Sequence, residues 1–79
     1  MLYKRYVDVV LMQKKSGDII PLYVCWDNGR KYKIDKIIDK GRSVSSVGGC
    51  GMRYTCMIGG QAKRLYLEKD KWFIESAKP

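Results

Sequence analysis

The feature that most constrains the fold is an alternation of apolar and other residues that recurs in short stretches along the chain. Within residues 6–13, Val7, Val9 and Leu11 occupy every second position. Successive side chains of a β-strand point to opposite faces, so this period of two predicts a strand with a buried face. Comparable patterns occur in five further stretches: residues 19–26, 30–38, 52–58, 63–68 and 71–76.

Turn signals separate these six stretches. Asp27-Asn28-Gly29 is the clearest, because Asn-Gly supplies the positive φ angles of a type I′ hairpin turn. Further turns are expected at residues 14–18, where Gly17 follows a polar cluster, at Gly59-Gly60 and at Lys69-Asp70. Short strands with a turn every 8 to 12 residues or so predict a small all-β barrel or sandwich.

Two positions break the alternation. Ile37 and Ile38 are adjacent, which predicts a β-bulge or a strand end between them. Pro21 lacks an N–H for the sheet ladder, so it suits the start of a strand or a sheet edge.

Length and charge limit the function. The 79 residues predict a single β-barrel domain over residues 1–79, since a separate core needs roughly 50 residues. A net charge of +8 attracts polyanions such as nucleic acid, acidic protein surfaces or anionic lipid. No apolar run reaches the roughly 20 residues that a bilayer requires, and no signal-peptide pattern is present. We therefore expect a cytoplasmic protein with no membrane partner.

The segment from Lys40 to Gly51 is rich in glycine and serine and is expected to form a flexible loop, residues 40–51. Its glycines fit neither of the common phosphate-binding patterns, and a strand-like stretch follows where those patterns require a helix. A phosphate cradle is therefore not expected here.

The cysteines do not indicate a metal site or a cofactor. Cys25, Cys50 and Cys56 lack the paired spacing of zinc ligands, and the chain contains no histidine. Without histidine the commonest general base is missing, so we expect a protein that is not an enzyme. Catalysis through Cys50 remains an alternative, which rapid and selective alkylation of that thiol would support.

The excess of basic residues suggests a binding surface. If the strands close into a barrel, basic residues on neighbouring strands can neutralise phosphates while exposed aromatic rings stack on unpaired bases. The candidate nucleic-acid-binding residues are Lys31, Lys33, Lys40, Arg42, Arg53, Lys63 and Arg64.

The aromatic residues divide into two groups. Trp26, Tyr32, Tyr54 and Trp72 share strand faces with aliphatic residues and are expected in the core. Tyr6, Tyr23 and Phe73 lie on less regular faces and are expected to be exposed, where they would suit a protein partner.

Two sequence patterns carry a resemblance to known families. The run "PLYVCWDNGRKYKIDKIID" and the later "MRYTCMIGGQAKRLYLEKDKWFIE" resemble a family of small uncharacterised Firmicutes proteins, over Pro21 to Glu75. The chain is more loosely similar to small actinobacterial proteins that are sometimes encoded beside translesion DNA polymerases. That likeness implies nucleic-acid metabolism.

By analogy with SH3-like barrels, the expected fold is a five- or six-stranded antiparallel barrel. The leading hypothesis is a small basic module that binds DNA or RNA. The alternative is a protein-interaction module that uses exposed apolar and tyrosine residues or an unpaired strand edge.

Overall fold

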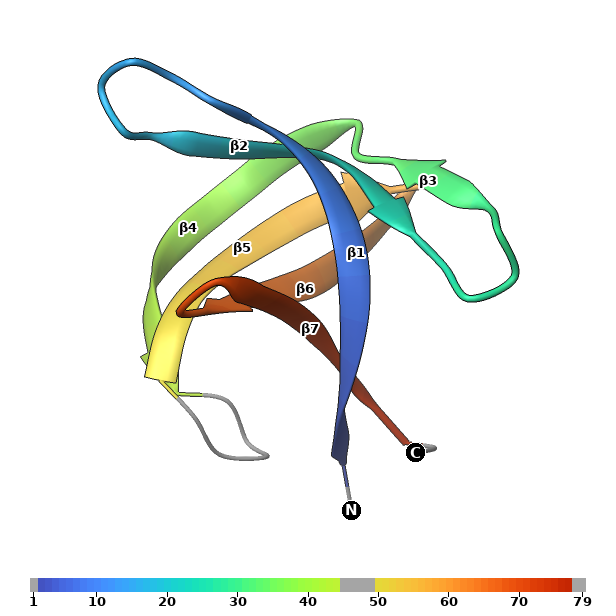
Figure 1. Ribbon diagram of the computed structural model, residues 1–79. Helices are drawn as coiled ribbons and strands as arrows, with labels where there is room; N and C mark the ends of the chain where they lie inside the picture. The colour runs from blue at the N-terminus through green and yellow to red at the C-terminus, as the bar shows by residue number, and fades with distance from the viewer. Residues whose placement is uncertain (1, 45–49, 78–79) are drawn as a thin grey trace.

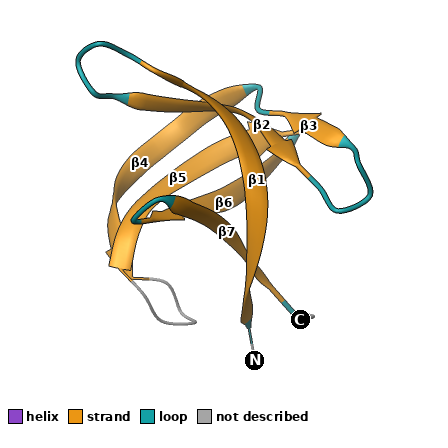
Figure 2. Cartoon of the chain, viewed as in Figure 1, coloured by secondary structure: helices purple, strands orange, loops and turns teal. Residues whose placement is uncertain are grey.

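The computed structural model describes residues 2–44 and 50–77, and these residues form strands joined by turns, with no helix among them (Figure 2). The predicted all-β class is confirmed. The strands are β1 (Tyr3–Gln13), β2 (Ile19–Cys25), β3 (Lys31–Lys33), β4 (Lys36–Val44), β5 (Cys50–Ile58), β6 (Gln61–Glu68) and β7 (Lys71–Ser76).

The strands form one antiparallel sheet in the order β3-β2-β1-β7-β6-β5-β4. The sheet curls strongly, so that its two ends approach each other and it forms a half-barrel (Figure 1). The described residues contain seven strands, whereas the sequence predicted five or six.

The additional strand arises because the predicted strand 30–38 changes partner at Ile34 and Asp35. The Ile34 N–H donates to the Leu22 carbonyl of β2 at 2.9 Å, and the Asp35 N–H donates to the Met57 carbonyl of β5 at 2.8 Å. The chain therefore leaves β2 and joins β5 within two residues. We call Ile34–Asp35 the edge link, because it connects β3 and β4, the two edge strands of the sheet.

The prediction of a flexible loop over residues 40–51 is wrong at both ends. Lys40 pairs with Tyr54 and Val44 pairs with Cys50, so β4 continues far beyond the predicted strand end. Residues 45–49 lie outside the described part of the chain. Gly51 has a packing role that composition does not reveal, since a Cβ at this position would lie 2.0 Å from the Leu67 carbonyl oxygen.

The hairpin predicted at Asp27-Asn28-Gly29 is confirmed, but its turn type is wrong. The Gly29 N–H donates to the Trp26 carbonyl at 3.0 Å, and the Trp26 N–H donates to the Arg30 carbonyl at 2.8 Å. Gly29 alone of these three residues has a positive φ, of 82°. This is a three-residue loop that ends in a left-handed glycine, whereas type I′ needs two positive φ angles.

The other predicted hairpins are also confirmed. The β1–β2 connection repeats the three-residue geometry, with Gly17 at φ 97° and its N–H donating to the Lys14 carbonyl. The two positive φ angles of a type I′ turn occur instead at Gly59 and Gly60, between β5 and β6. A two-residue connection at Lys69-Asp70 joins β6 to β7.

Both predicted irregularities fall where the sequence placed them. The β4–β5 register shifts between Ile37 and Asp39, which confirms a bulge at Ile38. Pro21 pairs with Leu11 of β1, and β3 begins to pair with β2 only at Tyr23. The missing N–H of Pro21 therefore lies where β2 has β1 as its single strand partner.

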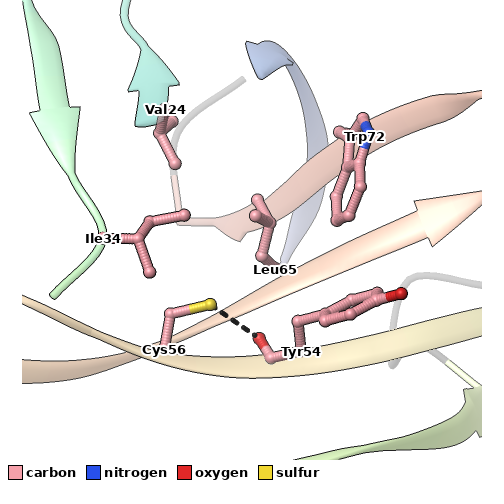
Figure 3. Close-up of a cluster of buried hydrophobic side chains, with 6 residues drawn as sticks. All are labelled: Val24, Ile34, Tyr54, Cys56, Leu65 and Trp72. Carbon is pink, nitrogen blue, oxygen red and sulfur yellow. Dashed lines mark hydrogen bonds between the residues drawn. The ribbon is translucent and has the colours of Figure 1, made fainter. Parts of the chain in front are cut away.

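The core lies on the inner face of the curled sheet. Its buried residues come from four strands and the edge link: Val24, Ile34, Tyr54, Cys56, Leu65 and Trp72 (Figure 3). The Tyr54 and Trp72 rings lie 5.3 Å apart, and both residues are buried as predicted. Trp26 packs against this core but is only half-buried. Tyr32 was also predicted in the core, and this is wrong, because it is 39% exposed.

A smaller aromatic cluster lies on the outer face, where the sequence predicted an exposed Phe73. This prediction is wrong, since Phe73 is 2% exposed. Tyr66 stacks on its ring at 5.1 Å, Tyr6 meets it edge-on at 5.9 Å, and the Lys4 Nζ lies 5.1 Å from its centroid. Three neighbouring strands bring these side chains together, which the pattern of any one strand cannot show.

The predicted exposure of Tyr6 and Tyr23 is confirmed. Lys4 and Glu68 cover part of the outer cluster with an ion pair of 2.8 Å. This contact raises the pKa of Lys4 and lowers the pKa of Glu68, mainly through the hydrogen bond between the two groups.

Gly51 provides a test of the strand packing. We expect Gly51→Ala to reduce the free energy of unfolding by about 1–3 kcal/mol, because the new Cβ must displace the β6 backbone. Gly41→Ala is the matched control, since the nearest atom to its Cβ is an Arg53 nitrogen at 4.0 Å. This control should be neutral or stabilising by about 0.5 kcal/mol. Urea unfolding measures both values, and equal effects of the two substitutions would contradict the packing role.

Candidate nucleic-acid interface

The seven basic residues predicted to bind nucleic acid are divided between the two faces of the sheet. Lys40 pairs with Tyr54 and Lys63 pairs with Cys56, so both lie on the side of the inner core residues. Arg42 lies on the same side of β4, two residues after Lys40. The other four lie on the outer side: Lys31 and Lys33 on β3, Arg53 on β5 and Arg64 on β6.

Arg53 is the least suited of the seven to bind a phosphate. Its Nη2 donates to the Asp39 carboxylate at 2.9 Å, which neutralises the charge on the outer face. Its side chain is largely covered, and its Nε is buried without a hydrogen-bond partner. A phosphate would have to displace Asp39, so the structure gives Arg53 a role in joining β4 to β5.

The structure places Lys63 in a pocket with two aromatic residues. The pocket has a volume of about 280 Å³ and opens between the β2–β3 hairpin and the strands β5, β6 and β7. We call it the mouth pocket; its lining residues are Val24, Trp26, Tyr32, Ile58, Lys63 and Ile74. Lys63 is the one charged residue of this lining.

Trp26 is fixed in the mouth pocket by a cation on its ring. The Arg5 guanidinium lies 4.6 Å from the Trp26 ring centroid. Arg5 is itself held by the Asp27 carboxylate, whose Oδ2 lies 2.6 Å from the Arg5 Nη2. Because the stacked cation already restricts the indole ring, the ring loses less conformational entropy when a second flat group stacks on it than a free ring would. Trp26 is thus prepared as one wall of the pocket.

Tyr32 forms the exposed part of the pocket. It pairs with the buried Val24 across β2 and β3, yet 39% of its surface is accessible because β3 is an edge strand of three residues. Its chain neighbours Lys31 and Lys33 are exposed on the opposite face of β3. The ion pairs found among the described residues use Lys4, Arg5 and Arg53.

Lys31, Lys33 and Lys63 therefore keep their charge without a carboxylate partner in the described structure. A lysine side chain is long and flexible. The ammonium groups of Lys31 and Lys33 can therefore reach toward the rim of the mouth pocket although these residues lie on the opposite face of the short strand β3. Tyr32 therefore has two such lysines as chain neighbours and a third in the lining of its own pocket.

Sequence reasoning assigned Tyr32 and Trp26 to the core and so missed them as site residues. The alternation with Ile34 made Tyr32 look buried, because a strand pattern cannot show where the sheet ends. A usable signal was present in Arg30-Lys31-Tyr32-Lys33, where an aromatic residue stands among three basic residues. Interleaved basic and aromatic residues are typical of nucleic-acid-binding surfaces.

The thiols do not contribute chemistry to the mouth pocket. Cys56 is fully buried, its Sγ lies 3.5 Å from the Tyr54 carbonyl oxygen, and burial raises its pKa to about 11 (Figure 3). Cys25 is half-buried on the other face of β2. The side chain of Cys50 lies outside the described part of the structure.

Within residues 2–44 and 50–77, no group of three or more potential metal ligands comes together. In the same residues, no helix has the length and apolarity needed to cross a membrane.

Comparison of the chain with protein-family models, with curated proteins and with solved structures gives no match.

The burial of Cys56 predicts a large difference between two thiols. At pH 8 the native protein should be alkylated by iodoacetamide at Cys25, whereas Cys56 should react only after unfolding in urea. A pKa of about 11 in place of 9.0 leaves about a hundredfold less reactive thiolate, and burial further blocks access. Peptide mass spectrometry measures both sites, and native labelling of Cys56 at the rate of Cys25 would contradict the assigned core.

Proposed function

We propose that the protein is a small, non-catalytic module that binds single-stranded nucleic acid, with one base held in the mouth pocket. The observation that carries this proposal is the exposed Tyr32, which shares a pocket with the half-buried Trp26 and the unpaired Lys63. Flat aromatic walls beside a single cation suit a stacked base next to its phosphate. Stacking on a protein ring contributes about 1–3 kcal/mol per base.

The pocket supports a single strand as the ligand. Its volume of about 280 Å³ lies at the lower end of small-molecule sites, so it accommodates one flat group and not several. A base within a duplex would first have to leave its stack, which costs a few kcal/mol. The lining contains no carboxylate or amide that would read the edge of a base, so binding should depend little on sequence.

The basic residues supply the electrostatic part of the proposal. Lys63 lies in the pocket, and Lys31 and Lys33 flank Tyr32, so these three are proposed to contact the phosphates nearest the bound base. Lys40 and Arg42 on β4 and Arg64 on the outer face of β6 lie outside the pocket lining and add to the long-range attraction of a chain with net charge +8. Arg53 contributes least, because Asp39 neutralises it.

The wider assignments belong to the same proposal. The half-barrel is proposed to be of the SH3-like type, with the edge link taking the place of a continuous strand. The resemblance to small Firmicutes proteins and to the actinobacterial proteins near translesion polymerases is proposed to reflect common descent. A cytoplasmic location, where single-stranded nucleic acid is present in bacteria, is part of the proposal.

Fluorescence anisotropy with labelled oligothymidylate of about 12 nucleotides tests the proposal. We expect micromolar affinity near 25 mM salt and much weaker binding near 200 mM, because bound cations are released from the phosphates. Tyr32→Ala should weaken binding by about tenfold, as expected for the loss of one stacked base. Lys63→Ala should weaken binding and lower the slope of log affinity against log salt by about 1.

Tyr23→Ala is the matched control for Tyr32→Ala. Tyr23 is 37% exposed, belongs to the same hairpin and lies on the opposite face from Tyr32, outside the mouth pocket. Its removal should leave the affinity unchanged. The proposal fails if oligothymidylate does not bind at low salt, or if the two tyrosine variants bind equally well.

A further inference from the structure

A second opening lies on the other side of the edge link from the mouth pocket. β2 pairs with β3 only from Tyr23 to Cys25, so Ile19, Ile20 and Pro21 have β1 as their single strand partner in the described structure. β4 pairs with β5 and, as an edge strand, has no partner on its other side among the described residues. The two incompletely paired strands diverge from the edge link, as Figure 1 shows for β2 and β4.

A groove of about 430 Å³ lies between these two strands. We call it the seam. β2 lines one side with Ile19, Ile20, Pro21 and Leu22, the edge link contributes Ile34 and Asp35, and β4 lines the other side with Lys36, Ile37 and Lys40. The seam is thus a largely apolar channel with two lysines and one carboxylate on its β4 side, and it runs along backbone that the sheet has left unpaired.

We propose that the seam binds an extended peptide of a partner protein, which adds as a strand to β4 and carries apolar and acidic residues on the side that faces the seam. This inference does not rest on nucleic-acid binding at the mouth pocket. It assigns a different surface and a different chemical class of ligand.

The backbone argument selects β4 as the strand that receives the peptide. A sheet edge presents unpaired N–H and C=O groups that an incoming strand can satisfy. β4 contains nine residues and no proline, whereas Pro21 removes a donor from the facing part of β2. An added segment of about five or six residues, the usual length of a strand, fits along β4.

The side chains select an acidic and apolar sequence. Lys36, Lys40 and Arg42 of β4 are exposed and form no ion pair in the described structure. Ile19, Ile20 and Ile37 offer apolar contacts to every second residue of a strand in the groove. Ile37 pairs with Cys56 and Lys40 pairs with Tyr54, so Ile37, Lys40 and Arg42 lie on one side of β4. A strand with valine beside Ile37 and glutamates at its next two positions on that same side would therefore match both the apolar and the cationic residues.

The same charges disfavour a second copy of the chain. Pairing two β4 edges would bring two sets of these cations together in molecules that each carry a net charge of +8. The bulge at Ile38 also interrupts the edge, which is a common protection against self-association. An acidic peptide is not repelled by these cations. It also has no bulge of its own that would have to match the bulge in β4.

The probe is a fluorescein-labelled peptide of about seven residues, in which one valine and two glutamates occupy alternate positions between threonines, so that all three share one face of the strand. Anisotropy measures its affinity for the full chain, and hydrogen exchange followed by mass spectrometry locates protected amides. We expect saturable binding below about 1 mM, slower exchange in β4, and at least tenfold weaker binding after Lys40→Glu. Lys71→Glu is the matched control, because this exposed lysine lies on β7, three places from β4 in the sheet.

Two altered peptides separate strand addition from simple charge attraction. The same peptide with lysines in place of its two glutamates should not bind, and the same peptide with alternate amides N-methylated should bind at least tenfold more weakly. The inference is overturned by absent binding, by equal binding of either altered peptide, by equal effects of the two lysine variants, or by protection outside β4. Protection of β4 that grows with concentration of the protein alone would identify a second copy as the occupant and would also overturn it.

Discussion

The edge link is the constraint on which the rest of the structure depends. Two backbone hydrogen bonds, from Ile34 to Leu22 and from Asp35 to Met57, hold the two ends of the curled sheet together. Ile34 is 7% exposed and packs in the core, so the same residue that closes the sheet also fills its interior. A flat sheet of these strands would leave the inner apolar face in water. Curvature is therefore a requirement of burial in so small a chain.

Side chains are buried on both faces of the sheet, which explains how a chain of 79 residues buries enough apolar surface to fold. The inner core contains the tilted ring pair of Tyr54 and Trp72, and the outer cluster places Phe73 beneath Tyr66 and Lys4. The outer cluster needs three strands in register, with Tyr6 opposite Phe73 and Phe73 opposite Tyr66. It thus fixes the relative positions of β1, β7 and β6, the centre of the sheet, while the edge link fixes its ends.

Both proposed binding surfaces occur where closure of the half-barrel is incomplete. The mouth pocket exists because β3 ends after three residues and leaves Tyr32 partly uncovered in the pocket that it shares with Trp26. The seam exists because β2 and β4 separate beyond the edge link. The two surfaces favour different ligands. Aromatic faces beside cations favour a base with its phosphate, and a free strand edge favours an extended backbone. A small protein can present both because they lie on opposite sides of one link.

The sequence by itself determined the strand class, the positions of the turns and the bulge at Ile38, because these depend on residues that are neighbours along the chain. Alternation, Gly17, Gly29 and the Ile37–Ile38 pair all act within a few residues. Tertiary structure alone decided that residues 31–44 change partner, that Gly51 avoids a β6 carbonyl, that Phe73 is buried and that Tyr32 is exposed. Each of these features depends on which strand or turn lies next to the residue. The alternation within one strand shows which residues share a face, but it does not show what covers that face.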